Sequence, residues 1–233
     1  MKRNNLILTD MIIREIIENA AKQREMAMHK ISLIRRDLTP DLFKELFMIR
    51  AQQIMIEHKS PGEFIVDDDN REVINLLYYH ATRNEKKINP YNGIILNGSY
   101  GCGKSVLIGA YCRVLNDIGI INEKIEEFHS VELADHIRLN GIIAYARKPL
   151  LIQDLGKEPN IVNTFGTVVN PISNLLAVRA EYGSLTFGST NHKLSTISEL
   201  YKEYIGKRII EHVNFIFLPG RDRRPDYSIN QPK

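Results

Sequence analysis

The sequence predicts an α/β protein in which helices cover a central parallel sheet, preceded by a helical N-terminal segment. Two observations predict this class. Residues 1–62 carry apolar residues at helical spacing, as in "IIREIIENAA". From residue 63 onward, short apolar runs alternate with helical stretches, the pattern of strands joined by crossover helices. The first of the later strands also ends in a glycine-rich turn that opens a helix.

The N-terminal segment, residues 1–62, is expected to end in a well-marked helix. In "LTPDLFKELF" Thr39 is the expected N-cap, Pro40 the first helical residue and Asp41 a first-turn acid. The stretch "HKSPGE" then breaks the helix around Pro61 and Gly62. After a short extended piece, Asn70 is expected to cap the next helix.

Five strands are expected in the second region, which we take as residues 63–227, with a short tail at 228–233. They are predicted at residues 93–96, 126–130, 149–153, 184–189 and 213–218, each a short apolar run with turn signals around it. Helical stretches separate most of them. The alternation predicts a three-layer arrangement, with helices on both faces of the sheet.

Composition narrows the class of protein. The chain has 233 residues, is 43% hydrophobic and carries a net charge of +3, which is compatible with a nucleic-acid partner without requiring one. Its apolar runs are far shorter than the roughly 18 residues that a membrane span needs, so no membrane partner is expected. Cys102 and Cys112 are expected to be free thiols, which fits the cytoplasm.

The motif "GSYGCGKS", residues 98–105, matches the phosphate-binding pattern G-x-x-x-x-G-K-[ST] in full. Its glycines let the backbone aim N–H groups at phosphate oxygens, and the following helix adds the positive end of its dipole. Lys104 is expected to reach the β- and γ-phosphates, and the Ser105 hydroxyl to bind Mg²⁺. The expected nucleotide contacts are Gly98, Ser99, Tyr100, Gly101, Cys102, Gly103, Lys104, Ser105 and Val106.

The stretch "LLIQDLGKE" places an amide and a carboxylate at the end of the third predicted strand. Two alignments are open. In the first, Gln153 occupies the position beside the metal ion and Asp154 the position that polarises the attacking water. In the second, Asp154 occupies the position beside the metal ion and Leu155 the water-polarising position. An amide accepts hydrogen bonds but carries no charge, so Mg²⁺ would then depend on Ser105 and the phosphates. The 50 residues between Lys104 and Asp154, with "EEFHS" inside them, argue for an extra strand inserted between the two site strands.

Later residues complete the candidate site. Asn191 follows the fourth predicted strand and is expected to sense the γ-phosphate, although it could instead cap the next helix. Arg208, Arg223 and Arg224 are the late basic candidates, and an arginine that reaches a neighbouring subunit's phosphate can add about 10³–10⁵ in rate. Spacing alone does not choose among them.

Together "GSYGCGKS", "LLIQDLGKE", "RAEYGSLTFGSTN" and "YIGKRIIEHVNFIFLPGRDRR" resemble the DnaC/IstB-like AAA+ ATPases over about residues 64–225. The resemblance implies a P-loop AAA+ (ASCE) fold that hydrolyses ATP with Mg²⁺, and it favours the first alignment of Gln153 and Asp154. It implies sensor roles for Asn191 and Arg224, with Arg223 as the fallback. Arg208 matches one of two basic positions on a helix, while the second, often given as the finger acting in trans, falls on His212. Arg179 matches a recurrent arginine of less certain role.

The resemblance also implies partners. Helicase loaders of this family deliver a replicative, DnaB-type helicase to single-stranded DNA, assemble as ATP-dependent homo-oligomers and contact the helicase through their N-terminal region. Two alternatives stay open. One is an IstB-like helper that marks target DNA for a transposase; the other is a nucleotide-binding switch that hydrolyses ATP weakly because Gln153 replaces an acid. Under the first alignment, Gln153→Asp is expected to raise turnover.

Overall fold

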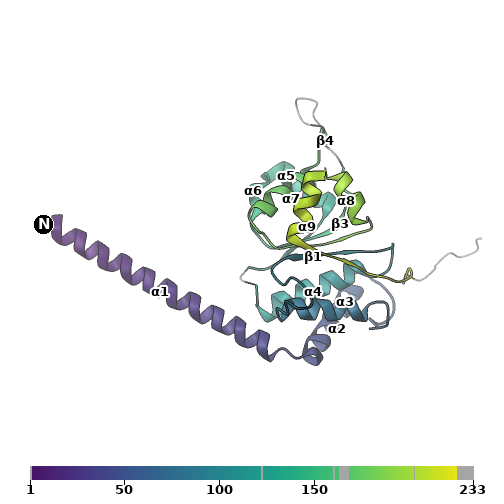
Figure 1. Cartoon of the computed structure of the whole chain (residues 1–233), viewed down its shortest axis with the longest axis horizontal. Helices are drawn as coiled ribbons and strands as arrows, with labels where there is room; N and C mark the ends of the chain where they lie inside the picture. Colours follow the sequence, from purple (N-terminus) through teal and green to yellow (C-terminus); the bar gives the residue numbers. More distant parts are fainter. Residues whose placement is uncertain (1, 122, 160, 163–167, 202, 225–233) are drawn as a thin grey trace, which may run out of the picture. The chain divides into compact units, whose positions relative to one another are not determined.

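A computed structural model of the chain describes residues 2–121, 123–159, 161–162, 168–201 and 203–224. The chain divides into two compact units, residues 1–39 and residues 40–233, and each is described by itself (Figure 1). The predicted tail at 228–233 lies outside the described residues, as do residues 225–227 of the predicted second region. Among the described helices, none is both long and apolar enough to cross a membrane.

The first unit is one long helix, α1 (Lys2–Asp37). Its last turn continues to Leu38, whose backbone N–H donates to the Ile34 carbonyl at 2.9 Å. Ile16 and Ile17 are each 61% exposed, and the neighbouring isoleucines of this stretch are about half exposed. The helix therefore forms as predicted, and its apolar isoleucines are left open to solvent.

The second unit is built on a five-stranded sheet in which every pairing is parallel. The sheet contains β1 (Gly93–Asn97), β2 (Glu126–His129), β3 (Leu150–Leu155), β6 (Thr186–Thr190) and β7 (Val213–Phe217), in the order β2-β3-β6-β1-β7. All five predicted strands are thus confirmed. One strand does separate β1 from β3, as expected, but it is β6. From the sequence, the inserted strand was expected to be "EEFHS", which forms β2; in the structure β2 is an edge strand of the sheet.

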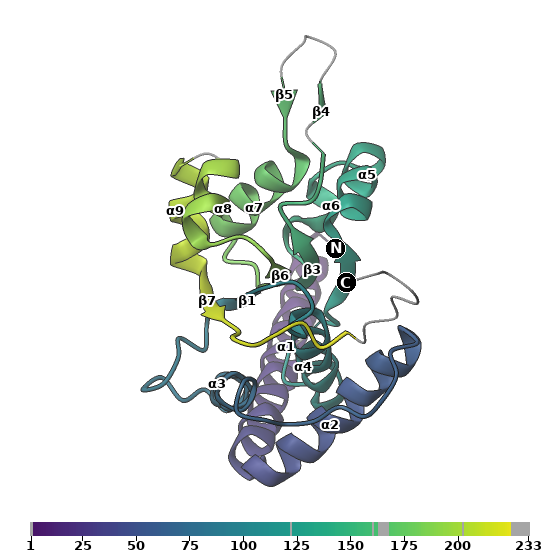
Figure 2. The ribbon, with the colours of Figure 1, turned by 90° about the vertical axis from the view of Figure 1, so that its right-hand side faces the viewer.

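Helices cover both faces of this sheet (Figure 1). On one face lie α2 (Pro40–Glu57), α3 (Arg71–Ala81) and α4 (Lys104–Ile118); the other carries α5 (Ser130–Asn140), α6 (Ile143–Ala146), α7 (Pro171–Glu181), α8 (Leu194–Leu200) and α9 (Glu203–His212). This arrangement confirms the predicted three-layer α/β class. A small antiparallel pair, β4 (Ile161–Val162) and β5 (Val168–Val169), extends away from the sheet and was not predicted (Figure 2).

The helix α2 belongs to the second unit, which begins at Pro40 and not near residue 63 as the sequence suggested. Phe43, Phe47, Ala51 and Ile54 on α2 are all buried. A side chain at Gly109 of α4 would lie 3.0 Å from the Ile54 methyl group, so the glycine permits the close approach of the two helices. The predicted break at "HKSPGE" separates α2 from α3, and both helices belong to the second unit.

Two ion pairs fasten α2 to α4 at the surface of this contact. Arg50 pairs with Asp117 on α4, and Glu57 accepts two hydrogen bonds from Arg113 at 2.6 and 2.7 Å. The Arg113 guanidinium lowers the pKa of the Glu57 carboxyl below its usual value. The glycine-rich loop leads into the N-terminus of α4, so the packing of α2 on α4 helps to hold the helix that carries the candidate site.

Candidate nucleotide-binding site

The glycine-rich loop lies between β1 and α4, as the motif predicts. Gly101 and Gly103 have φ of 69° and 102°, in the left-handed region that favours glycine, and α4 begins directly afterwards at Lys104. A side chain at Gly98 would come within 2.4 Å of the Leu218 carbonyl oxygen. Each of these three glycines is therefore required by the backbone, and the loop presents its N–H groups at a helix N-terminus, where anions bind.

Lys104 is buried against its own loop. Its Nζ donates to the carbonyls of Gly98 at 3.0 Å and Ser99 at 2.6 Å, and it lies 3.8 Å from the Cys102 sulfur. Burial lowers the pKa of the Lys104 amine, and the charges of Cys102 and Asp154 oppose that shift. The Asp154 effect shows that the acid at the β3 tip and the loop lysine lie close enough to feel each other's charge.

Residues 218–224, which we call the C-terminal strap, run from β7 across the glycine-rich loop. The Arg223 N–H donates to the Gly101 carbonyl at 3.0 Å, and the Ser99 hydroxyl donates to the Gly220 carbonyl at 2.9 Å. An Asp222 carboxylate oxygen occupies the space that a side chain at Gly101 would need, 1.7 Å from such a Cβ. The strap therefore closes one side of the loop.

A cavity of about 730 Å³ opens beside the loop, within the size range of small-molecule sites. It is lined by the loop and first turn of α4, by the segment before α3 and by the strap, including Phe64, Ile65, Asp67, Gly103, Val106, Leu107 and Arg221. Asn70 shapes this segment: its side chain accepts from the Asp67 N–H and donates to the Ile65 carbonyl. It thus holds the cavity wall, and makes no side-chain cap for α3.

The end of β3 is bent at Asp154. This residue has a φ of 59°, a conformation that non-glycine residues rarely adopt and that concentrates at functional sites. Two hydrogen bonds hold it there: its N–H donates to the Ser189 hydroxyl at 3.0 Å, and its carbonyl accepts from the Ser130 hydroxyl at 2.8 Å. The ladder to β6 shifts register between Ile152 and Leu155. The bend therefore aims Asp154 out of the strand, where Lys157 pairs with its carboxylate at 2.8 Å.

Gln153, next to that bend, is buried at 2% exposure. Its Nε2 donates to the Ser105 carbonyl at 3.3 Å and to the Glu127 carboxylate at 2.9 Å, while its Oε1 accepts from the Ser189 hydroxyl at 2.6 Å. The β3 tip and the first turn of α4 are thus joined directly. The predicted pair Gln153–Asp154 and the predicted loop meet at one edge of the sheet.

Asn191 lies at the same edge, directly after β6. It is not the cap of the next helix, since α8 begins at Leu194 with Lys193 in the cap position. Its neighbour His192 packs on Gly156, where a side chain would come within 2.5 Å of the imidazole ring. The glycine of "QDLG" therefore lets the segments that follow β3 and β6 touch.

The predicted arginines occupy different places. Arg223 donates to Asp67 at 2.7 and 2.8 Å across the cavity mouth, and Arg224 pairs with Asp222 on the strap. Both line the cavity beside the loop. Arg208 on α9 pairs with Glu181 at the end of α7, just before the turn into β6, and so belongs to the opposite edge of the sheet. His212 is the last residue of α9.

Arg179 is a structural residue. It is 1% exposed and donates to four acceptors: the Thr186 hydroxyl and the carbonyls of Tyr145, Lys148 and Leu185. Burial lowers its pKa to about 9. These partners lie where β3 and β6 begin, at the far end of the strands from the phosphate loop, so Arg179 locks helices to the sheet and does not enter the site.

Sequence reasoning missed three parts of the site. These are Lys157, which pairs with Asp154; Glu127, which holds Gln153; and the cavity wall from Phe64 to Asp69. Lys157 stood inside the quoted motif and was a readable signal. Glu127 had none, because its contact depends on β2 pairing beside β3.

No protein-family model matches the sequence, and no curated protein matches it as a relative. Solved structures with which it aligns include the DnaC helicase loader, at 16% identity and a TM-score of 0.49 over 67% of this chain and 93% of that one. DnaI aligns at 22% identity and a TM-score of 0.49, over 69% of this chain and 87% of that one. A putative primosome component from Streptococcus pyogenes aligns at 17% identity and a TM-score of 0.49, over 69% of this chain and 85% of that one. AMPPCP-bound DnaA from Aquifex aeolicus aligns at 16% identity and a TM-score of 0.45, over 69% of this chain and 50% of that one. Matches this distant do not identify a function, which rests here on the site itself.

Proposed function

We propose that this chain is an AAA+ ATPase that binds ATP in the loop 98–105 and hydrolyses it with Asp154. The observation that carries the proposal is the meeting of Lys104, Ser105 and the Gln153–Asp154 tip at one edge of a parallel sheet. A chance glycine-rich turn would not bring a lysine and a serine at the start of a helix together with a strained acid at the end of a separate strand.

The residues fit a nucleoside triphosphate. Three glycines shape a cradle that any side chain would disturb, and a cavity large enough for a nucleoside adjoins it. At the head of the loop, the buried Asn97 Oδ1 has no hydrogen-bond partner within the described residues, which leaves an acceptor for a bound group or water. The Ser105 hydroxyl and the Asp154 carboxylate are oxygen donors of the kind that Mg²⁺ prefers.

Each residue then has a role that its position supports. Lys104 would exchange its loop carbonyls for phosphate oxygens and offset their charge. Ser105 would hold Mg²⁺, which supplies charge neutralisation on the phosphates when bound. Asp154, aimed outward by its bend, would orient the attacking water, and Asn191 would help to place it. Arg223 or Arg224 would reach the nucleotide from the strap, while Arg208 would serve a neighbouring copy of the chain.

The client we propose is a replicative, DnaB-type helicase, which the chain would deliver to single-stranded DNA. The motif resemblance supports this role, and α1 offers a surface for it, since four isoleucines at positions 12, 13, 16 and 17 are 49–61% exposed. Exposed apolar side chains gathered on one helix mark an interaction surface. Backbone contacts to DNA would make its binding fall steeply with salt.

A second candidate is a nucleotide-binding switch with little turnover, and Gln153 favours it. The amide turns its nitrogen, and not its oxygen, toward Ser105, so it offers no ligand on that side. ATP binding and ATP turnover, the latter with and without single-stranded DNA, separate an ATPase from a switch. Turnover that depends on Mg²⁺ and DNA supports the loader. Tight ATP binding without turnover supports the switch.

The client is tested by affinity capture with the native host's replicative helicase and, in parallel, with a transposase from the same genome. We expect the chain to capture the helicase, and we expect the substitutions Ile16→Ser and Ile17→Ser to abolish that capture. Capture of the transposase alone would overturn the loader in favour of a transposition helper. Capture of neither would overturn both clients.

A further inference from the structure

The orientation of the Gln153 amide is fixed by its neighbours. The Ser105 carbonyl can only accept hydrogen bonds, and the same Gln153 nitrogen also lies 2.9 Å from the Glu127 carboxylate. The amide oxygen is meanwhile occupied by the Ser189 hydroxyl. Gln153 therefore cannot present its oxygen to a metal ion beside Ser105 without breaking all three bonds.

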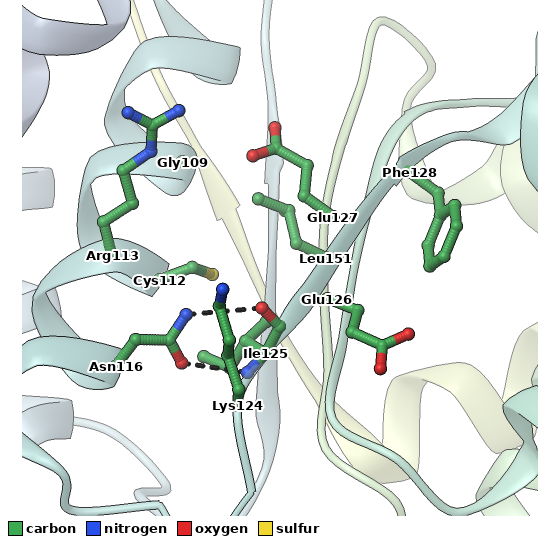
Figure 3. Close-up of a pocket in the computed structure, with 10 residues that line it drawn as sticks. All are labelled: Gly109, Cys112, Arg113, Asn116, Lys124, Ile125, Glu126, Glu127, Phe128 and Leu151. Atoms are coloured by element: carbon green, nitrogen blue, oxygen red, sulfur yellow. Dashed lines mark hydrogen bonds between the residues drawn. The ribbon is translucent and has the colours of Figure 1, made fainter.

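Glu127 reaches Gln153 from the neighbouring strand. Its carboxylate stands in a cavity of about 620 Å³ between β2 and α4, with Gly109 and Arg113 on the helix side (Figure 3). A side chain at Gly109 would lie 3.9 Å from the Glu127 carboxylate and 3.8 Å from the Gln153 nitrogen. Both distances are ordinary van der Waals contacts, so the Glu127–Gln153 contact lies directly beside α4.

The charged side chains around Glu127 have hydrogen-bond partners of their own. Arg113 pairs with Glu57, and Glu126 on the same strand pairs with Lys148. Arg113 also feels the charge of Glu127, which adds to the effect of Glu57 in raising its pKa. The Glu127 charge is felt on α4, since it adds to the burial that raises the pKa of the Cys112 thiol well above its usual value. Within the described residues, the Gln153 amide donates a hydrogen bond to the Glu127 carboxylate.

We propose that Glu127 supplies the negative charge that the β3 tip lacks at position 153, and that it acts through the Gln153 amide to position the first turn of α4. The inference rests on the proposed function, because that turn carries Ser105. Glu127 is a positioning residue and does not touch substrate. Its charge-assisted hydrogen bond anchors the Gln153 nitrogen, which keeps the second N–H of the same amide directed at the Ser105 carbonyl and so steadies the turn that carries the Ser105 hydroxyl.

This inference reverses the expected result of restoring an acid at position 153. A glutamate introduced there would place its carboxylate within hydrogen-bond distance of Glu127, and two like charges at that distance repel; an aspartate places the same charge one methylene farther back. Gln153→Asp or Gln153→Glu alone should therefore impair the protein. Moving the charge, with Glu127→Gln and Gln153→Glu together, keeps one acid and one amide in contact.

The test is a set of four full-length proteins: wild type, Glu127→Gln, Gln153→Glu and the double variant. Thermal melting without metal or nucleotide reads the pair directly. We expect Gln153→Glu to lower Tm by roughly 2–4 °C and the double variant to recover at least half of that loss. Recovery is partial because the introduced acid faces the Ser105 carbonyl. Equal melting of the single and double variants would overturn the pairing.

The second readout is the Mg²⁺ concentration that gives half-maximal ATP turnover. Glu127→Gln keeps an acceptor for the Gln153 nitrogen but removes the charge, so Tm should change little while half-saturation weakens about 5–10-fold. The double variant restores the charge of the pair but has no N–H for the Ser105 carbonyl, so it should recover Tm without recovering half-saturation. Glu126→Gln removes the same charge one residue away and should change neither readout.

The two proposals fail in distinguishable ways. If Glu127→Gln leaves Mg²⁺ half-saturation unchanged in a protein that hydrolyses ATP, the role of Glu127 is overturned and the ATPase stands. If the wild type neither binds nor hydrolyses ATP, the proposed function falls and takes the Mg²⁺ role with it. The melting series would then still decide whether residues 127 and 153 act as a pair.

Discussion

The loop after β1 and the bend at the end of β3 lie at the same edge of one sheet, yet they are built differently. The loop depends on its own glycines, of which Gly101 and Gly103 have positive φ, and all of them lie within one short stretch of sequence. The bend depends on side chains from elsewhere: Ser130 and Ser189 hold the strained Asp154, and Glu127 holds Gln153. A local structure is readable from a short motif, whereas one supported by neighbouring strands is not. We accordingly expect changes in the loop to affect binding, and changes in the bend to affect turnover.

The largest effect is expected at the bend. Asp154→Asn removes the carboxylate but keeps its size and its tolerance for positive φ, so the fold should persist. Loss of a general base typically lowers turnover by about 10²–10⁴-fold, and we expect a fall in that range with ATP affinity within about threefold of wild type. Steady-state kinetics and equilibrium binding measure the two quantities.

Asp135→Asn, an exposed acid on α5 that pairs locally with Arg138, is the matched control and should leave both unchanged. Undiminished turnover in Asp154→Asn would remove the bend from the catalytic account.

Changes in the loop should lower ATP affinity and not turnover. Lys104→Ala removes a buried cation aimed into the phosphate cradle, and truncating one partner of such a charge contact costs about 2–5 kcal/mol. ATP affinity should fall by about 30-fold or more. Titration calorimetry against Lys148→Ala, which removes an exposed lysine paired with Glu126, provides the comparison. Retained affinity would show that the loop is not the phosphate site.

The strap's contact with the loop can be separated from backbone strain. Gly101→Ala and Gly119→Ala both force alanine into positive φ, at 69° and 64°, which costs about 1–2 kcal/mol in each case. Only position 101 also meets Asp222; nothing lies within 4 Å of position 119. Gly101→Ala should therefore lose more stability and, unlike Gly119→Ala, weaken ATP binding by about tenfold. Denaturant melts and binding curves decide, and equal behaviour would mean that the strap does not press on the loop.

The smallest effect concerns the ion pair across the cavity mouth. Arg223 lowers the pKa of the Asp67 carboxyl below 3.8, chiefly by hydrogen bonding. A lowered folded-state pKa stabilises the protein above the unfolded value and is lost as pH falls through the folded one. Asp67→Asn should thus cost up to about 1 kcal/mol at pH 7, a modest figure because the pair is partly exposed.

That difference should shrink below about pH 4 and vanish at lower pH, as judged by urea melts of both proteins. A difference between the two proteins that stayed constant down to pH 2 would contradict the assignment of the pair.

The outcome for sequence reasoning follows the same division. The five strands, the helix at Pro40 and the phosphate loop were predictable because hydrophobic spacing and glycine chemistry act locally. The strand between β1 and β3, the place of α2 and the partner of Gln153 were not, because each depends on contacts between segments far apart in the chain. The hairpin of β4 and β5 is too short to give a readable pattern.

The most direct test of the account is a crystal structure of the chain with Mg²⁺ and a non-hydrolysable ATP analogue. The account predicts phosphates in the loop 98–105, the nucleoside in the cavity between Phe64 and the strap, Asp154 facing the terminal phosphate, and the Gln153 nitrogen still bonded to Glu127. A Gln153 oxygen turned to the metal shell with Glu127 released, or a nucleotide bound elsewhere, would contradict it.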